Sequence, residues 1–123
     1  MAEHNDFGKL AEAQAAEYLE NNGCKILAKN YRYLKAEIDL ICETHDQILF
    51  VEVKARATDV FMEPQEAVNK KKIRLLVSAA DQFLQQNNLE KEARFDIISV
   101  LPDSTGALQI THIPDAFLST DAN

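Results

Sequence analysis

Residues 37–54 read Glu-Ile-Asp-Leu-Ile-Cys-Glu-Thr-His-Asp-Gln-Ile-Leu-Phe-Val-Glu-Val-Lys, and this stretch decides the fold. Before a short polar connection the apolar residues 38, 40 and 42 alternate with residues 37, 39 and 41, and after it the apolar residues 49, 51 and 53 alternate with residues 48, 50, 52 and 54. A period of two is typical of β-strands. We therefore expect a β-hairpin. If the hairpin turns on residues 45–46, Asp39 falls opposite Glu52, and Lys54 lies on the same face of its strand as Glu52.

This register brings like charges together. Directly opposed Cβ atoms in a sheet are about 4.5–5.5 Å apart, and like charges at that separation destabilise a strand pair. A divalent cation between the carboxylates of Asp39 and Glu52 would make the arrangement favourable, because hard cations take carboxylate oxygens as ligands. Lys54 would hold or activate a water molecule or a phosphate oxygen beside them. These groups are the equipment of metal-assisted phosphodiester hydrolysis.

The same residues have a simpler interpretation. Glu52 and Lys54 would then form the solvated face of an ordinary antiparallel sheet, with Glu37 and Lys54 as an exposed ion pair of little worth. However, residues 48–53 are apolar apart from Glu52, which predicts a strand that is buried on both faces. A charge in a buried strand needs a partner, a metal ion or a function.

The composition predicts one globular domain. The chain has 123 residues, of which 46% are hydrophobic and 27% charged, so we expect a single domain over residues 1–123 with a core over about 6–117. Cys24 and Cys42 are interpreted as core thiols, which favours a reducing, cytoplasmic setting, and two cysteines are too few for a zinc site. No apolar run reaches the length of a membrane span and the N-terminus has no signal-peptide pattern, so no membrane partner is expected.

The charge of the chain is acidic but unevenly distributed. The formal net charge of −7 argues against nucleic-acid binding through a broad basic surface. Basic residues nevertheless gather at residues 70–74, and Arg32, Lys35 and Arg56 flank the hairpin. The candidates for phosphate contacts are therefore Lys70, Lys71 and Lys72 of the basic run.

Helical spacing of apolar residues near the N-terminus predicts a first helix from about Asp6 to Asn22. Asn5 or Asp6 is the expected N-cap, and Gly23 is the expected stop signal. Glu12 lies near the middle of this helix, beside the apolar stripe. It would be either a solvated acid or an outer member of the carboxylate cluster.

A second helix is predicted after Asn69, its expected N-cap. That start places Lys70, Lys71 and Lys72 in the first turn, where the helix dipole disfavours each cation by roughly 0.3–1 kcal/mol. Such an arrangement suits the binding of an anionic phosphate. In the alternative interpretation the helix already starts at Pro64, and the lysines are mid-helix and merely solvated.

The remaining pattern completes an α/β fold. Strands are expected at residues 24–30, 95–101 and, more weakly, 108–113, and a loop at residues 57–64. A long helix between two strands predicts a crossover with parallel pairing. The expected order is α-β-β-β-α-β-β, a three-layer α/β arrangement with a mixed sheet flanked by helices. His112 is interpreted as an isolated residue on the sheet surface.

The order of elements, with Asp39 followed by Glu52-x-Lys54 on the next strand, resembles the PD-(D/E)xK nucleases of the restriction-endonuclease-like fold. More narrowly, residues 7–117 resemble the bacterial YraN-like family of predicted endonucleases, which is related to archaeal Holliday-junction resolvases. The chain departs from that family at Ala36 and at residues 61–64, where the family has glycine. The matching pieces are Gly8-x-x-x-Glu12-x-x-Ala15, Asn30-Tyr-Arg32, Glu37-Ile-Asp39-Leu-Ile, Phe50-Val-Glu52-Val-Lys54-x-Arg56, Ala67-Val68 with Lys72, and Arg94-Phe-Asp96.

The resemblance implies an endonuclease that needs Mg²⁺ or Mn²⁺ and hydrolyses phosphodiester bonds in structured or branched DNA. It implies DNA as the partner and allows a homodimer that builds a continuous groove. Two other functions stay open: a nucleic-acid-binding protein that does not cut, and a protein-interaction module on a nuclease scaffold. The implied residues are Glu12, Asp39, Glu52 and Lys54 in catalysis, Asp39 and Glu52 as metal ligands beside the Val53 carbonyl, and Arg56 and Lys72 on phosphates.

Overall fold

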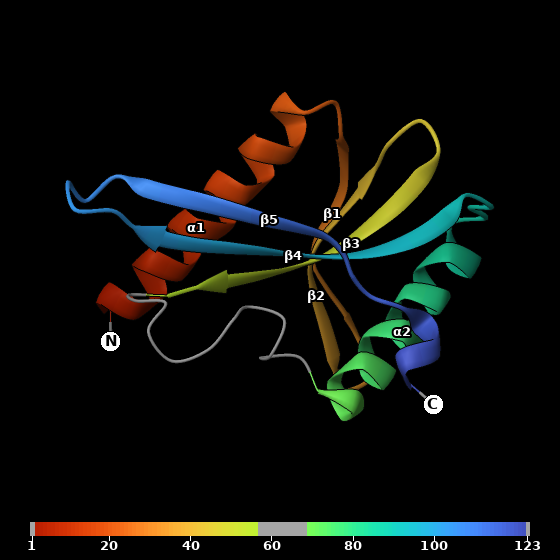
Figure 1. The fold of residues 1–123 in the computed structure, drawn as a ribbon. Coiled ribbons are helices and arrows are strands. Elements are labelled where there is room, and N and C mark those ends of the chain that lie inside the picture. The colour runs from red at the N-terminus through yellow and green to blue at the C-terminus, as the bar shows by residue number, and fades with distance from the viewer. Residues whose placement is uncertain (1, 57–68, 123) are drawn as a thin grey trace.

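The computed structural model describes residues 2–56 and 69–122, and within them the predicted order α-β-β-β-α-β-β is confirmed (Figure 1). The loop expected at 57–64, and Pro64 as a helix start, lie outside the described residues. None of the described helices is long and apolar enough to cross a bilayer. The elements are α1 (Ala2–Asn21), β1 (Lys25–Tyr33), β2 (Ala36–Glu43), β3 (Gln47–Ala55), α2 (Lys70–Gln86), β4 (Glu92–Pro102), β5 (Leu108–Phe117) and a short 3-10 helix, η2 (Ser119–Ala122).

The five strands form one mixed sheet in the order β1-β2-β3-β4-β5. Neighbouring strands are antiparallel except β3 and β4, which are parallel and are separated in sequence by α2, as the crossover predicts. Two separate groups of buried apolar residues involve the two helices. One joins α1 to the sheet, and the other joins α2 to it, so the sheet is the middle of three layers.

The predicted hairpin register is confirmed. Leu40 pairs with Val51, and the backbone N–H of Thr44 donates to the carbonyl of Gln47 over 2.9 Å, so the hairpin turns on residues 45–46. The recorded pairing of β2 with β3 ends at Leu40 and Val51, although β2 begins four residues earlier, at Ala36. Beyond that point β2 pairs with β1 and β3 pairs with β4. The two strands therefore diverge, and we call this divergence the fork.

The strict alternation expected along β2 is wrong at the fork. Ile38 and Ile41 belong to the apolar group around α2, whereas Leu40 and Cys42 belong to the group around α1. A strand of unbroken period two would place positions 38 and 40 on one face. The pattern breaks where the pairing of β2 with β3 ends.

The start of α1 differs from the prediction. The helix begins at Ala2, so neither Asn5 nor Asp6 is its N-cap. Its end agrees with the prediction: Gly23 has a φ of +87°, and the N–H of Cys24 donates to the carbonyl of Leu19 over 3.0 Å. This is the left-handed cap that glycine adopts without a steric penalty.

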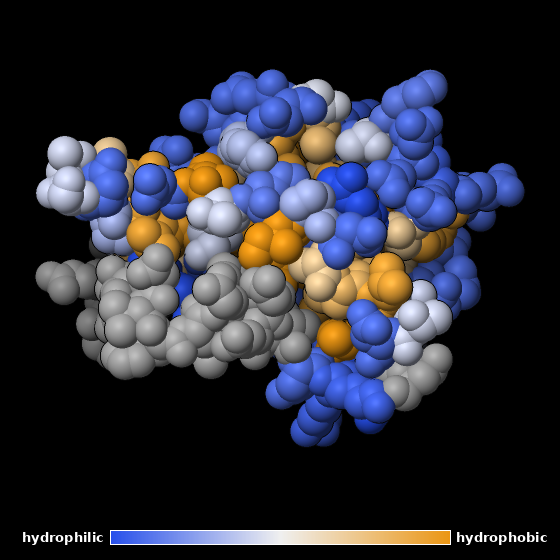
Figure 2. Space-filling view, in the orientation of Figure 1, coloured by the Kyte–Doolittle hydropathy of each residue, from blue (hydrophilic) through white to orange (hydrophobic). Residues whose placement is uncertain are grey.

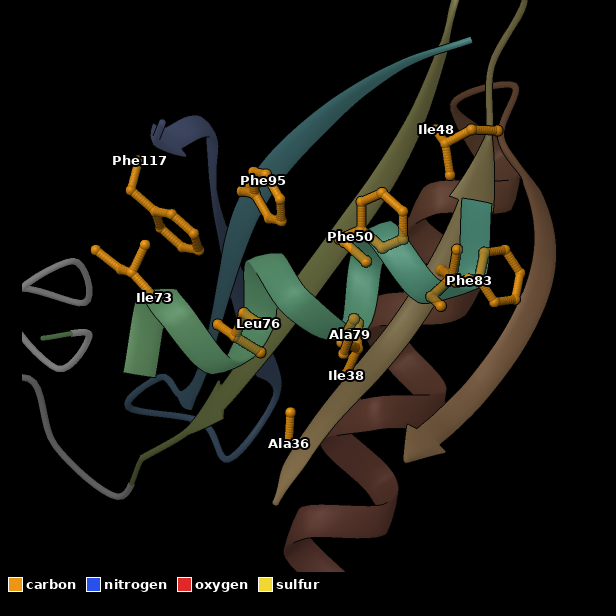
Figure 3. Close-up of a cluster of buried hydrophobic side chains, with 12 residues drawn as sticks. Ala36, Ile38, Ile48, Phe50, Ile73, Leu76, Ala79, Phe83, Phe95 and Phe117 are labelled. Atoms are coloured by element: carbon orange, nitrogen blue, oxygen red, sulfur yellow. The ribbon is translucent and has the colours of Figure 1, made fainter. Parts of the chain in front are cut away.

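The start of α2 agrees with the sequence. Asn69 has an extended backbone, and its side-chain oxygen accepts a hydrogen bond from the N–H of Lys72 over 2.9 Å, so it is the N-cap. The alternative in which the lysines are mid-helix is therefore wrong. Figure 3 shows the apolar side chains that α2 packs against the sheet. Among them Phe95 stacks on Phe50 with ring centroids 5.6 Å apart, and on Phe117 at 5.1 Å.

Candidate functional site

Asp39 lies at the fork, one residue before the last recorded pair of β2 and β3. Its Oδ2 accepts a hydrogen bond from the backbone N–H of Val53 over 2.8 Å. A backbone N–H that is buried needs an acceptor, and here the neighbouring strand no longer supplies one. The carboxylate of Asp39 takes the place of that carbonyl, which fixes the side chain against β3.

Glu52 is the buried acid of the fork, with 9% of its surface exposed. The Nζ of Lys72 lies 2.8 Å from its Oε2. Oε2 is buried, and a carboxylate oxygen has two lone pairs, of which this one contact can use only one. Glu52 therefore keeps a buried lone pair for a further electrophile.

The carboxyl groups of Asp39 and Glu52, here called the acidic pair, contact each other and titrate together. Burial raises the pKa of Asp39 from 3.8 to about 8, and the contact and charge of Glu52, with a smaller effect of Glu12, act in the same direction. Burial would also raise the pKa of Glu52, but its contacts with Asp39 and Lys72 and the charge of Lys54 lower it instead. Without a metal ion the pair therefore holds one proton and one negative charge near neutral pH.

Two amines accompany the acidic pair. Burial lowers the pKa of Lys54, and its contact with Lys72 lowers it further. Burial also opposes the charge on Lys72, but its contacts with Glu52 and Lys54 and the negative charge of the acidic pair together outweigh burial and raise the pKa of Lys72. Lys72 is therefore the permanent counter-ion, and Lys54 is the amine that gives up its proton more easily.

The structure brings the central residues predicted from sequence into one cluster and leaves others outside it. Lys72, expected to contact phosphates, contacts Glu52. Among the described residues, the effect of Glu12 on the cluster is that of its charge on Asp39. Asp39, Glu52, Lys54 and Lys72 form the cluster, Lys70 and Lys71 are exposed at the start of α2, and Arg56 follows the end of β3.

Arg56 is tied to the sheet through its backbone, whose N–H donates to the carbonyl of Val100 over 2.9 Å. Its side-chain Nε is buried and has no acceptor within residues 2–56 and 69–122. A buried donor without an acceptor is costly, and an anion would satisfy it.

A hollow of about 310 Å³ adjoins the cluster. Lys35 and Glu37 line it from the β1–β2 side, and Asn69, Lys71 and Lys72 line it from the start of α2, so that three lysines face one acid. We call it the lysine hollow. In Figure 2 hydrophilic residues cover the end of the molecule where α2 begins in Figure 1. Lys35 could not be singled out among the basic residues beforehand, because the sequence does not show that the turn between β1 and β2 lies beside the start of α2.

The donor set of the acidic pair suits a hard divalent cation. Glu52 offers a buried oxygen that contacts Lys72 and keeps a further lone pair, and the carboxyl group of Asp39 lies in contact with Glu52. In the described part of the chain no three His, Cys, Asp or Glu side chains gather closely enough to hold a metal ion by themselves. Mg²⁺ is commonly held by one or two carboxylates, with water and substrate phosphates as its other ligands. The residues present fit that kind of site.

Comparison with known proteins gives the family. The model of the family described as "Uncharacterised protein family UPF0102" matches residues 11–100. The chain belongs to the UPF0102 family. It is 44% identical over 117 residues to a UPF0102 protein of Christiangramia forsetii (95% of this chain, 98% of the relative) and 45% identical over 111 residues to one of Sulfurihydrogenibium (89% and 92%). The matched span contains Glu12 and the whole cluster around the acidic pair.

This UPF0102 chain has a second polar network, and in it His112 is not isolated as its sequence context suggested. Asp96 is fully buried and contacts Nη2 of Arg94 and Nε2 of His112, each at 2.7 Å. The hydroxyl of Tyr18 lies 3.0 Å from Nδ1 of His112, and the N–H of Asp115 donates to Asp96 over 3.0 Å. The network ties α1, β4 and β5 together, so its evident role is structural. Only the tertiary fold reveals it, because its members are far apart in sequence.

Proposed function

We propose that this protein is a metal-dependent endonuclease that hydrolyses phosphodiester bonds in structured or branched DNA. The observation that carries the proposal is the buried contact between Asp39 and Glu52 at the fork, with Lys54 and Lys72 beside it. The resemblance to the YraN-like and PD-(D/E)xK nucleases supports the same chemistry. Paired carboxylates and an amine of lowered pKa, placed together, are typical of catalytic sites.

Asp39 and Glu52 would hold Mg²⁺ or Mn²⁺. When bound, the cation would polarise the scissile phosphate and stabilise the developing negative charge. The N–H of Val53 holds Asp39 in place, and Lys72 keeps Glu52 ionised and fixed. These contacts orient the two carboxylates before the substrate arrives.

Lys54 is the group of this chain that would act on the attacking water. Its lowered pKa leaves a larger fraction of its amine neutral, and so able to accept a proton, than in an exposed lysine, and its position beside the acidic pair puts it within reach of a phosphate held there. Lys72 serves as a positioning residue, because its charge is already committed to Glu52.

A cleavage assay tests the proposal. The full chain is incubated with a labelled four-way junction and a linear duplex in Mg²⁺, Mn²⁺ or EDTA. We expect cleavage of the junction that requires the metal, and a loss of about 100-fold or more in Asp39→Asn and Lys54→Ala. Asp46→Asn, an exposed acid in the hairpin turn, is the matched control and should cut normally. Cleavage by Lys54→Ala at the rate of the parent, or no cleavage by the parent, would contradict the proposal.

One observation favours a second function, that of a nucleic-acid-binding protein that does not cut. The acidic pair is charge-balanced without a metal ion, by a shared proton and by Lys72. Such a protein would bind DNA with an affinity that falls with salt and would show no cleavage in any divalent cation. Because the chain has a net charge of −7, a homodimer that joins two lysine hollows would give a longer basic surface than one chain does. Light scattering measures whether the protein is a dimer.

A further inference from the structure

The turn between β1 and β2 holds a leucine in a backbone conformation that leucine rarely adopts. Leu34 has a φ of +56°. Two-residue hairpin turns with a positive φ favour Gly, Asn and Asp, because a Cβ with an apolar branch crowds the backbone there. Among the described residues the other non-glycine positions with positive φ are all of these tolerant types, namely Asn30, Asn88 and Asp115.

Leu34 is also the most exposed large apolar residue of the described part of the chain, with 82% of its surface open. The next most exposed, Leu118, reaches 53%. Packing therefore does not explain why a leucine stands at this strained position. Unfavourable backbone conformations that persist without a packing reason cluster at functional sites.

The surroundings of Leu34 indicate the kind of partner. The neighbouring Lys35 lines the lysine hollow together with Lys71 and Lys72, and Lys72 in turn contacts Glu52 of the acidic pair. Arg32, two residues before Leu34, has 78% of its side chain exposed and only a loose 3.5 Å contact with Glu37. The bare apolar tip thus stands in the chain between two cationic residues, and the second of them, Lys35, lines the lysine hollow.

We propose that the β1–β2 turn is the element that recognises branched DNA, with Leu34 inserted at an unstacked base step while Lys35 and Lys71 hold the flanking phosphates in the lysine hollow. This inference rests on the proposed function, since it assigns the substrate feature that brings a phosphate to the acidic pair. Apolar side chains that enter between base pairs act as wedges, and the cost of unstacking is lowest where the stack is already interrupted, as at a branch. Lysines on phosphates position the protein without reading the sequence.

Fluorescence anisotropy of the full chain with a labelled junction and a labelled linear duplex, both in Ca²⁺, tests the inference. Leu34→Asn is the informative variant, because asparagine tolerates a positive φ and removes only the apolar surface. We expect its affinity for the junction to fall about tenfold, with its affinity for the duplex unchanged and its Tm equal to or above that of the parent. Leu34→Met should keep the affinity for the junction, and Leu118→Asn is the matched control.

The lysines give an independent readout. Lys35→Gln or Lys71→Gln should weaken binding to both DNAs and lower the slope of log affinity against log salt by about one. Parent-like binding of the junction by Leu34→Asn, an equal loss on both DNAs, or no DNA binding by the parent would overturn the inference. If the parent cuts DNA but Leu34→Asn binds normally, the inference alone fails. If Leu34→Asn loses junction binding but the parent does not cut in Mg²⁺, the proposed nuclease function alone fails.

Discussion

Replacing Asp39 by Asn should stabilise the metal-free protein at pH 8 and leave it unchanged at pH 4. The pKa of Asp39 rises from 3.8 in its ordinary environment to about 8 in the fold, chiefly through burial and then through Glu52. A carboxyl group whose folded pKa is raised favours the folded state while it is protonated. That contribution is complete below about pH 4 and is lost as the pH rises towards 8.

The size of the effect follows from the pKa. Each tenfold change in an ionisation constant is worth about 1.4 kcal/mol, so an isolated group with this change would lose more than about 5 kcal/mol between pH 4 and 8. Two features of the fork reduce the figure. The pKa of Glu52 moves in the opposite direction, and Asp39 is only partly buried. We therefore expect about 1–3 kcal/mol.

Asparagine suits the test because its carboxamide oxygen can still accept from Val53, while its NH₂ donates to Glu52 as the shared proton does. Urea unfolding is followed by far-UV circular dichroism in EDTA at several pH values between 4 and 8. The free energy of unfolding of Asp39→Asn should exceed that of the parent progressively across this range, and Asp46→Asn should follow the parent. A variant that is less stable than the parent at pH 8, or a difference that does not depend on pH, would refute the reasoning.

Three further outcomes are expected. Mg²⁺ at one hundred times its Kd should stabilise the parent by about 2.7 kcal/mol in thermal unfolding and leave Asp39→Asn unaffected, and an equal rise in both would place the ion elsewhere. Lys72→Met should lower the free energy of unfolding at pH 7 by about 1–3 kcal/mol, because the contact with Glu52 is buried on one side only, whereas Lys71→Met should change it by less than about 0.5 kcal/mol. Asp96→Asn should cost about 2–4 kcal/mol at pH 7 in urea unfolding. Burial opposes the charge of Asp96, but His112 and Arg94 hold its pKa below its usual range. That loss should therefore begin to shrink below about pH 4 and disappear only below the lowered pKa, and a loss that does not shrink as the pH falls would contradict an ionic origin.

The hairpin at the centre of the fold could be predicted because its determinants are local. A two-residue turn and a period of two fix the register, which pairs Leu40 with Val51 and makes Asp39 and Glu52 the next positions along the two strands. The N-cap at Asn69 and the stop at Gly23 were equally readable, since each cap depends on a few neighbouring residues.

The features that were missed depend on contacts between distant segments. At the fork β2 stays paired with β1 and β3 stays paired with β4, and the alternation of β2 breaks at the same place. Lys72 reaches Glu52 only because α2 packs over that end of the sheet. His112 finds Asp96 and Tyr18 only when β5 lies beside β4 and α1 covers them. A single sequence without tertiary contacts carries none of this information.

The crossover between β3 and β4 also sets an order of events during synthesis. Residues 25–55 form three consecutive antiparallel strands, so the two acids of the fork can meet as soon as this meander leaves the ribosome. The lysine that balances them lies at position 72 and emerges later, at a rate of about 5–20 residues per second. For that interval the young chain carries an unbalanced pair of acids, and we expect its early folding to be more sensitive to protons and divalent ions than the finished protein is.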